Sequence, residues 1–133
     1  MRASAPSCIC CLRAGVPDET DNICILSIVG RYLEHSRIYI FGRGARARYY
    51  IGSADWMTRS TLRRVEIAAP VTAPALKARL QHIFDTMLAD NCNARVQQPD
   101  GSYVRRMPGA DAVDCQAQFY EEAYQANIPS RLK

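Results

Sequence analysis

The chain has 133 residues and a mass of 14.9 kDa, enough for one domain with a hydrophobic core. Hydrophobic residues make up 48% and charged residues 23%, which excludes a disordered or fibrous protein. The formal net charge is +4, and 15 of the 17 basic residues are arginines. Guanidinium groups bind phosphate oxygens through paired donors, so this composition suits a polyanionic partner, although a GC-rich coding sequence would produce the same bias.

No secretory signal is evident, and no apolar run approaches the roughly 18 to 20 residues that a membrane helix needs. The chain is therefore expected to be cytoplasmic, with reduced thiols. Its six cysteines lack the paired spacing of a zinc site, so no metal site is predicted.

The first elements in chain order lie before the histidine at position 35. Residues 9–12 form a short apolar run, which predicts a strand that enters a loop. From residue 25 to 33, the apolar side chains of Ile25, Val29, Tyr32 and Leu33 recur at helical spacing. This pattern predicts a short helix that leads to His35.

A hairpin is predicted next, because residues 37–41 and 47–51 are rich in strand-forming side chains and flank a glycine-containing loop. Alternating side chains over residues 65–69 predict a third strand, which Pro70 would end. His35 and Ser53 would then lie near the open end of the hairpin.

The clearest helix begins after a Thr72 cap, with Pro74 in its first turn. It exposes His82 and has an apolar stripe that is expected to be core: Leu76, Leu80, Ile83, Phe84, Met87 and Leu88.

A second hairpin is predicted from residues 95–96 and 103–104, around Pro99-Asp100-Gly101. A last helix near Asp111 would bury Val113, Ala117, Tyr120 and Tyr124. These elements predict an α/β (α+β) fold with a mixed sheet flanked by helices.

Two short sequences on either side of the first hairpin could carry chemistry. His35 and Arg37 come just before one strand, and Ser53 and Asp55 just after the other. A neutral imidazole can attack phosphorus or transfer a proton at neutral pH, and Arg37 would share a strand face with it. Ser53 and the turn amides could donate to phosphate oxygens, while Asp55 could orient the imidazole or an arginine. The four side chains form the predicted phosphate-binding site.

This arrangement resembles one half of a phospholipase D-type site, whose pattern is His-x-Lys followed by Gly-Ser-x-Asn. Arg37 stands in place of the lysine, and Asp55 in place of the asparagine. Both departures count against hydrolysis of a phosphodiester.

Longer stretches resemble the carboxy-terminal domain of the bacterial polyphosphate kinase family. They are ICCLR at residues 9–13, SIVGRYLEHSRI at 27–38, SADWM at 53–57 and RRVE at 63–66. Order and spacing match over residues 9–124. The resemblance implies a single phospholipase D-like domain and a reversible transfer of the terminal phosphate of ATP, with Mg²⁺, to inorganic polyphosphate. In this family the transfer passes through a phosphohistidine on a paired upstream domain, which this chain does not contain, so the isolated chain is expected to be inactive.

The same resemblance implies roles for individual residues. His35 would face the phosphorylated histidine, contact the nucleotide phosphates and act as general acid or base. Four arginines would line a polyphosphate tunnel and offset phosphate repulsion: Arg31, Arg37, Arg63 and Arg64. The sequence departs from the family at Ser7 and Cys8, where an Arg-Gly pair is expected to contact nucleotide phosphate.

The resemblance divides the chain into a divergent segment (1–8), the phospholipase D-like domain (9–128) and a basic tail (129–133). Two other functions stay open. One is a homodimeric phosphodiesterase or nuclease in which two His35 side chains complete one site. The other is a non-catalytic module that binds polyanions or docks on a full-length kinase. No base-reading motif is present, so no specific nucleic acid is expected.

Overall fold

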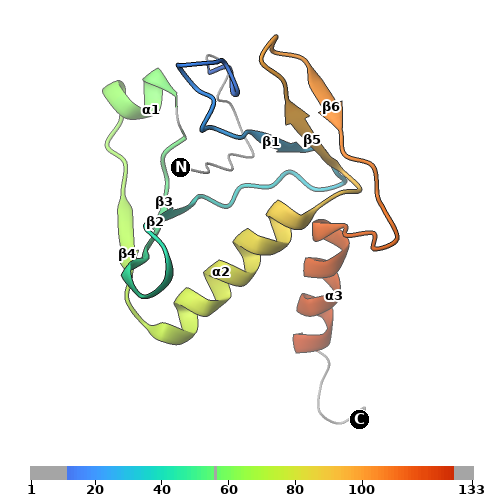
Figure 1. Ribbon diagram of the computed structural model, residues 1–133. Coiled ribbons are helices and arrows are strands. Elements are labelled where there is room, and N and C mark those ends of the chain that lie inside the picture. Colours follow the sequence, from blue (N-terminus) through green and yellow to red (C-terminus); the bar gives the residue numbers. More distant parts are fainter. Residues whose placement is uncertain (1–11, 56, 128–133) are drawn as a thin grey trace.

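The computed structural model describes residues 12–55 and 57–127, which form two small sheets and three helices (Figure 1). One sheet has the order β1-β5-β6, from strands Leu26–Ile28, Ala94–Gln97 and Tyr103–Arg105. The other has the order β2-β3-β4, from strands Ile38–Phe41, Arg48–Gly52 and Ala68–Val71. The helices are α1 (Thr58–Arg63), α2 (Pro74–Ala89) and α3 (Cys115–Asn127), with a 3₁₀ turn, η1, at Gly44–Arg46.

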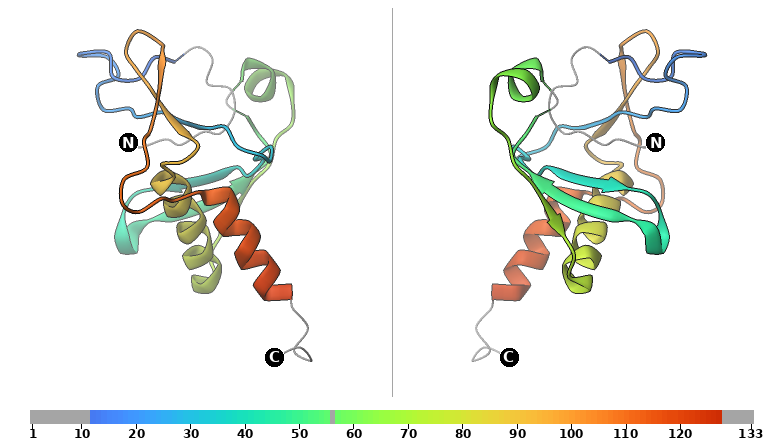
Figure 2. Two further views of the ribbon diagram at one scale, coloured as in Figure 1. Left: turned by 90° about the vertical axis from the view of Figure 1, so that its right-hand side faces the viewer. Right: turned by 90° about the vertical axis from the view of Figure 1, so that its left-hand side faces the viewer.

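The predicted α/β class is confirmed, but the strands do not form the single mixed sheet that was expected. Every strand pair among the described residues is antiparallel. Helices α2 and α3 contact each other and extend to the same side of the sheets (Figure 2). None of the helices formed by the described residues is long and apolar enough to cross a membrane.

The predicted hairpin is confirmed as β2 and β3, which pair from Ile38 opposite Ile51 to Phe41 opposite Arg48. Gly42 and Gly44 have positive φ angles of 87° and 55°, which glycine adopts without the steric cost of a side chain. These two residues turn the chain through η1. The second predicted hairpin is also confirmed, as β5 and β6.

The helix predicted over residues 25–33 is wrong. Ile25 and Leu26 are consecutive buried residues, and Leu26 to Ile28 pair with Val96 to Ala94 of β5. Pairing with a strand nearly 70 residues away therefore overrides a weak helical spacing in a segment rich in isoleucine. Of the strand predicted at residues 9–12, only Leu12 is described, and it is not in a strand.

Pro70 lies within β4 instead of ending a strand, and β4 begins three residues later than predicted. The amide of Ser53 donates to the carbonyl of Ile67 at 3.0 Å, so residues 53 and 67 form a hydrogen-bonded pair. Hydrogen-bonded and non-bonded pairs alternate along an antiparallel ladder. Tyr50 and Pro70 therefore form a non-bonded pair, and the proline nitrogen faces away from β3, where no donor is needed.

The long helix is confirmed as α2, with Pro74 as its first residue, although its cap is Ala73 and not Thr72. Its apolar stripe is only partly core, because Met87 is buried while Leu76 is 55% exposed. The last helix begins at Cys115, later than predicted. Its buried residues are Cys115 and Gln116, whereas the tyrosines expected in the core are exposed and stack on each other: Tyr120 and Tyr124.

The first turn of α3 is fixed by a buried carboxylate. Asp90, which is 0% exposed, accepts hydrogen bonds from the amides of Asn93 (2.7 Å), Ala94 (3.0 Å) and Cys115 (2.9 Å). Asp90 is the residue just after α2, and its hydrogen bonds join the end of that helix to the start of β5 and to the first residue of α3. It is the polar centre of the core, and the buried apolar residues among those described are few: Ala14, Ile25, Leu26, Ala47, Met87, Ala94 and Cys115.

Candidate functional site

The structure brings His35, Arg37 and Asp55 together at the open end of the β2–β3 hairpin, as the sequence predicts. The amide of Gly52 donates to the carbonyl of Arg37 at 3.0 Å, which extends the ladder beyond β2. Arg37 Nε donates to Asp55 Oδ1 at 2.7 Å. The Nη1 atom of the same guanidinium lies 3.1 Å from His35 Nδ1, and Nη2 lies 3.3 Å from His35 Nε2.

The distances from Nη1 to Nδ1 and from Nη2 to Nε2 limit how the guanidinium can contact the imidazole. The ring nitrogens of His35 point in the ring plane and away from each other, so one planar guanidinium cannot lie in line with both. The two contacts therefore cannot both be ordinary hydrogen bonds to His35, and which ring nitrogen accepts depends on the tautomer of the imidazole. Nη1 also donates to the carbonyl oxygen of His35 at 3.3 Å, so the guanidinium lies against both the ring and the backbone of this residue.

Charge at the site is arranged around the Arg37–Asp55 pair. The hydrogen bond from Arg37 is the main reason that the pKa of Asp55 lies below its usual value, and the charges of His35 and Arg59 act in the same direction. The same bond raises the pKa of Arg37. Asp55 therefore stays ionised and holds the guanidinium in place beside His35.

Ser53, which was predicted to bind phosphate, is hydrogen-bonded in the structure to Glu66 and Ile67. Its hydroxyl donates a very short hydrogen bond to Glu66 Oε2 and accepts one from the amide of Ile67 at 3.1 Å. Its own amide donates to the carbonyl of Ile67. Phosphate binding by Ser53 stays a prediction, and it requires the hydroxyl to release Glu66.

Glu66 and Tyr39 are part of the site, although the sequence did not single them out. The hydroxyl of Tyr39 donates to the carbonyl of Ala54 at 2.7 Å, which fixes the turn that carries Asp55. A Cβ at position 52 would lie 2.8 Å from a ring carbon of Tyr39, so Gly52 is needed for this approach. Glu66 is the last residue of the RRVE stretch, and its place in that stretch is the sequence feature that could have identified it as a site residue.

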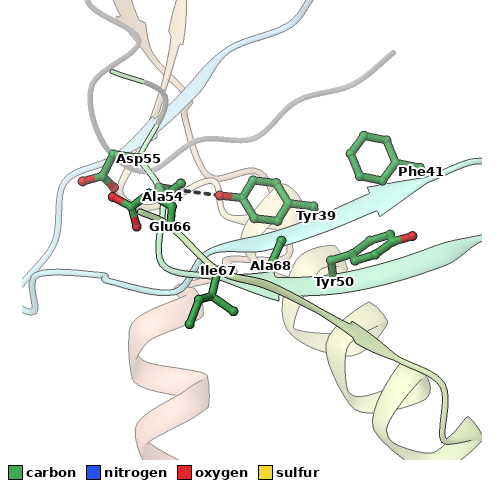
Figure 3. Close-up of a pocket in the computed structure, with 8 residues that line it drawn as sticks. All are labelled: Tyr39, Phe41, Tyr50, Ala54, Asp55, Glu66, Ile67 and Ala68. Atoms are coloured by element: carbon green, nitrogen blue, oxygen red, sulfur yellow. Dashed lines mark hydrogen bonds between the residues drawn. The ribbon is translucent and has the colours of Figure 1, made fainter. Parts of the chain in front are cut away.

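A cavity of about 340 Å³ opens beside these residues (Figure 3). The carboxylates of Asp55 and Glu66 lie at one end, and the rings of Phe41 and Tyr50 lie toward the other. Its remaining lining residues are Tyr39, Ala54, Ile67 and Ala68. The walls are thus mainly aromatic and aliphatic, with negative charge at one end.

The other predicted arginines are not joined to this cluster. Arg31 is exposed, and its guanidinium carbon lies 5.6 Å from the centre of the Tyr32 ring. Arg63 ends α1, and both it and Arg64 are exposed. No hydrogen bond or ion pair within the described residues links the three to His35. They are accessible to an anionic partner, and a tunnel role for them stays a prediction.

The described residues contain no cluster of candidate metal ligands. No three histidine, cysteine or acidic side chains among them are grouped closely enough to hold a metal ion. The two carboxylates of the site are engaged by Arg37 and Ser53. The Mg²⁺ expected with ATP stays a prediction.

Comparison with known proteins gives one consistent result. The sequence pattern of the family described as "Polyphosphate kinase C-terminal domain 2" matches residues 7–118. The chain is 46% identical over 117 residues to a polyphosphate kinase of Bacillus anthracis, covering 87% of this chain and 17% of that protein. It is 53% identical over 102 residues to a polyphosphate kinase of Synechocystis sp., covering 77% of this chain and 14% of that protein.

A solved structure agrees with the sequence matches. The crystal structure of polyphosphate kinase from Porphyromonas gingivalis superposes with a TM-score of 0.80 and 33% identity, covering 88% of this chain and 18% of that one. The chain thus spans about one sixth of the length of the relatives that it matches. The similarity includes the segments that carry His35, Arg37 and Asp55.

Proposed function

Because this chain belongs to the polyphosphate kinase C-terminal domain 2 family, we propose that it supplies the His35 half of a polyphosphate kinase site. The reaction would transfer the terminal phosphate of ATP reversibly to inorganic polyphosphate. The observation that supports this best is the cluster in which Asp55 holds the Arg37 guanidinium against His35, so that a cation and an imidazole lie side by side.

Each member of the cluster has a role that follows from its chemistry. Arg37 is permanently charged and offsets the negative charge of phosphate oxygens as the phosphoryl group moves. His35 donates a proton or hydrogen bond to a phosphate oxygen from a ring nitrogen, and takes the proton back in the reverse reaction. Asp55 does not contact substrate in this scheme, and it keeps Arg37 in position.

The phosphoryl group would be carried by a histidine on a paired upstream domain. The chain contains one histidine besides His35, and that residue, His82, is bonded to Glu122 at 2.8 Å on the α2–α3 side of the molecule. Large apolar side chains near the site are exposed, among them Leu62, Val65 and Ile67. Exposed apolar surface of this kind marks an interaction face, and we assign it to contact with the upstream domains.

ATP would enter this site as its magnesium complex, and the metal would come with the nucleotide. Exposed Arg31, Arg63 and Arg64 are placed in this proposal along the path of the polyphosphate chain. A cytoplasmic location belongs to the same proposal, since ATP is made there and free thiols stay reduced.

The proposal is tested by reconstitution. Polyphosphate formation from ATP and Mg²⁺ is measured with this chain alone, with the upstream domains of a related kinase alone, and with the two mixed. Activity is expected only in the mixture. It should fall at least about 100-fold with His35→Ala, the loss typical of a missing proton-transfer group, and stay unchanged with His82→Ala.

Other outcomes would support the alternative functions. Inactivity of the mixture, together with salt-sensitive binding of polyphosphate by this chain, would favour a non-catalytic polyanion-binding module. Magnesium-independent cleavage of a phosphodiester by the chain alone, lost in His35→Ala, would favour a homodimeric phosphodiesterase.

A further inference from the structure

The segment between β1 and β2 delivers His35 to the site, yet it is mostly exposed. Among the described residues, the backbone of residues 30–35 bonds to a partner distant in sequence only at Tyr32. The amide of Tyr32 donates to Gln116 Oε1 at 2.9 Å, and Gln116 Nε2 donates to the carbonyl of Tyr32 at 2.7 Å. One side-chain amide thus satisfies both backbone groups of Tyr32, as a neighbouring strand would.

Gln116 can hold this segment because its own backbone is fixed. It lies in the first turn of α3, where Asp114 Oδ1 accepts from the amide of Gln116 at 3.0 Å and from that of Ala117 at 3.0 Å. The preceding residue, Cys115, is bonded to the buried carboxylate of Asp90. The side chain of Gln116 is only 8% exposed. Its amide therefore projects from a rigid support.

Gly30 provides the space that this contact needs. A Cβ at position 30 would lie 2.3 Å from Gln116 Oε1 and 2.7 Å from its Cδ, closer than atoms approach without a shift. The φ angle of Gly30 is not positive, so its backbone conformation does not require glycine. The lack of room for a Cβ beside Gln116 is what requires it. Any larger residue would displace an amide whose donor and acceptor are both in use.

We propose that Gln116 is a positioning residue for His35. Its amide fixes the chain at Tyr32, three residues before the histidine, and the Arg37–Asp55 pair fixes it two residues after. His35 lies in the short span between the two supports. The proposal rests on the proposed function only for the chemistry that His35 performs.

The test is an NMR comparison of Gln116→Met with the matched control Gln125→Met. Methionine has the size of glutamine but can make neither hydrogen bond. Gln125 is exposed on the same helix, and its amide bonds only to Glu121 at 2.6 Å. In Gln116→Met, hydrogen exchange at the Tyr32 amide should accelerate about tenfold, as expected for a lost hydrogen bond of ordinary strength. The ring signals of His35 should shift and broaden, with no change in the control.

His82 is an internal reference for loosening of the whole helix, because its bond to Glu122 spans α2 and α3. Its ring signals should stay unchanged in Gln116→Met. Gly30→Ala should reproduce the shift at His35, whereas Gly109→Ala should not, since nothing lies within 4 Å of a Cβ there.

Two results would overturn the proposal. One is a His35 signal that stays as in the wild type in both Gln116→Met and Gly30→Ala. The other is equal disturbance of His35 and His82, which would mean that Gln116 only stabilises α3. If Gln116→Met does not fold, the Gly30→Ala spectra decide between these outcomes. All spectra are recorded without nucleotide, so failure of the proposed phosphate transfer would leave the result intact.

Discussion

Replacing Asp90 with alanine should remove much of the stability of this domain. The carboxylate is 0% exposed and accepts three backbone hydrogen bonds, two of them from the buried residues Ala94 and Cys115. Each buried donor left without an acceptor costs about 1–3 kcal/mol. With two such donors, the expected loss for Asp90→Ala is roughly 2–6 kcal/mol, out of the roughly 5–15 kcal/mol that holds a typical domain folded.

The measurement is urea denaturation followed by circular dichroism at pH 7. Asp100→Ala is the matched control, because Asp100 is an exposed carboxylate that accepts from the amide and hydroxyl of Ser102 at 2.8 and 2.6 Å. The control should lose less than about 1 kcal/mol. A similarly small loss for Asp90→Ala, with an unchanged dependence on urea, would refute the view that this carboxylate supports the core.

Asp90 should also shape the response of the domain to acid. Burial opposes its ionisation, but the amides of Cys115, Asn93 and Ala94 and the Cys115 thiol outweigh burial and hold the pKa of Asp90 below its ordinary value. Since an aspartate in the unfolded chain has a pKa near ~3.9, the stabilisation is complete above that pH and is lost as the pH falls through the folded pKa. Melting temperatures between pH 2 and 6 should show this loss in the wild type and not in Asp90→Asn.

Three further predictions concern the site and the thiols. Arg37→Gln should raise the pKa of Asp55 toward its usual value, because the guanidinium is what lowers it; carbon NMR of the carboxyl group measures this shift. Burial raises the pKa of the Cys115 thiol to about 12, so alkylation at pH 8 followed by peptide mapping should label exposed Cys24 much faster. Gly52→Ala should destabilise the chain by about 1–3 kcal/mol in thermal melts, because its Cβ would overlap the ring on β2.

The parts of the fold that the sequence predicted well are those set by local signals. The β2–β3 hairpin needs only a glycine loop between two strand-forming runs, and the site forms at its ends. His35, Arg37 and Asp55 therefore came together as expected. The contact of the Arg37 guanidinium with the His35 ring could not be predicted, since it depends on side-chain geometry that spacing does not encode.

Features that depend on distant partners were missed for a common reason. Strand β1 exists because β5 pairs with it, and the contact of Gln116 with Tyr32 joins residues 84 positions apart. Tyr120 and Tyr124 have helical spacing that resembles a core stripe, but no other element in the described part of the chain covers them. Periodicity shows which residues could share a face, and only the tertiary structure shows whether that face is covered.

Pro70 has a consequence for how this chain behaves at high concentration. Strand β4 is an outer strand of its sheet and is largely exposed, so another molecule could add a strand to it. Pro70 has no N–H at the position that faces outward, so an incoming strand would lack one hydrogen-bond donor there. The residue thus hinders edge-to-edge pairing of this apolar strand with another molecule, the kind of pairing that builds fibres.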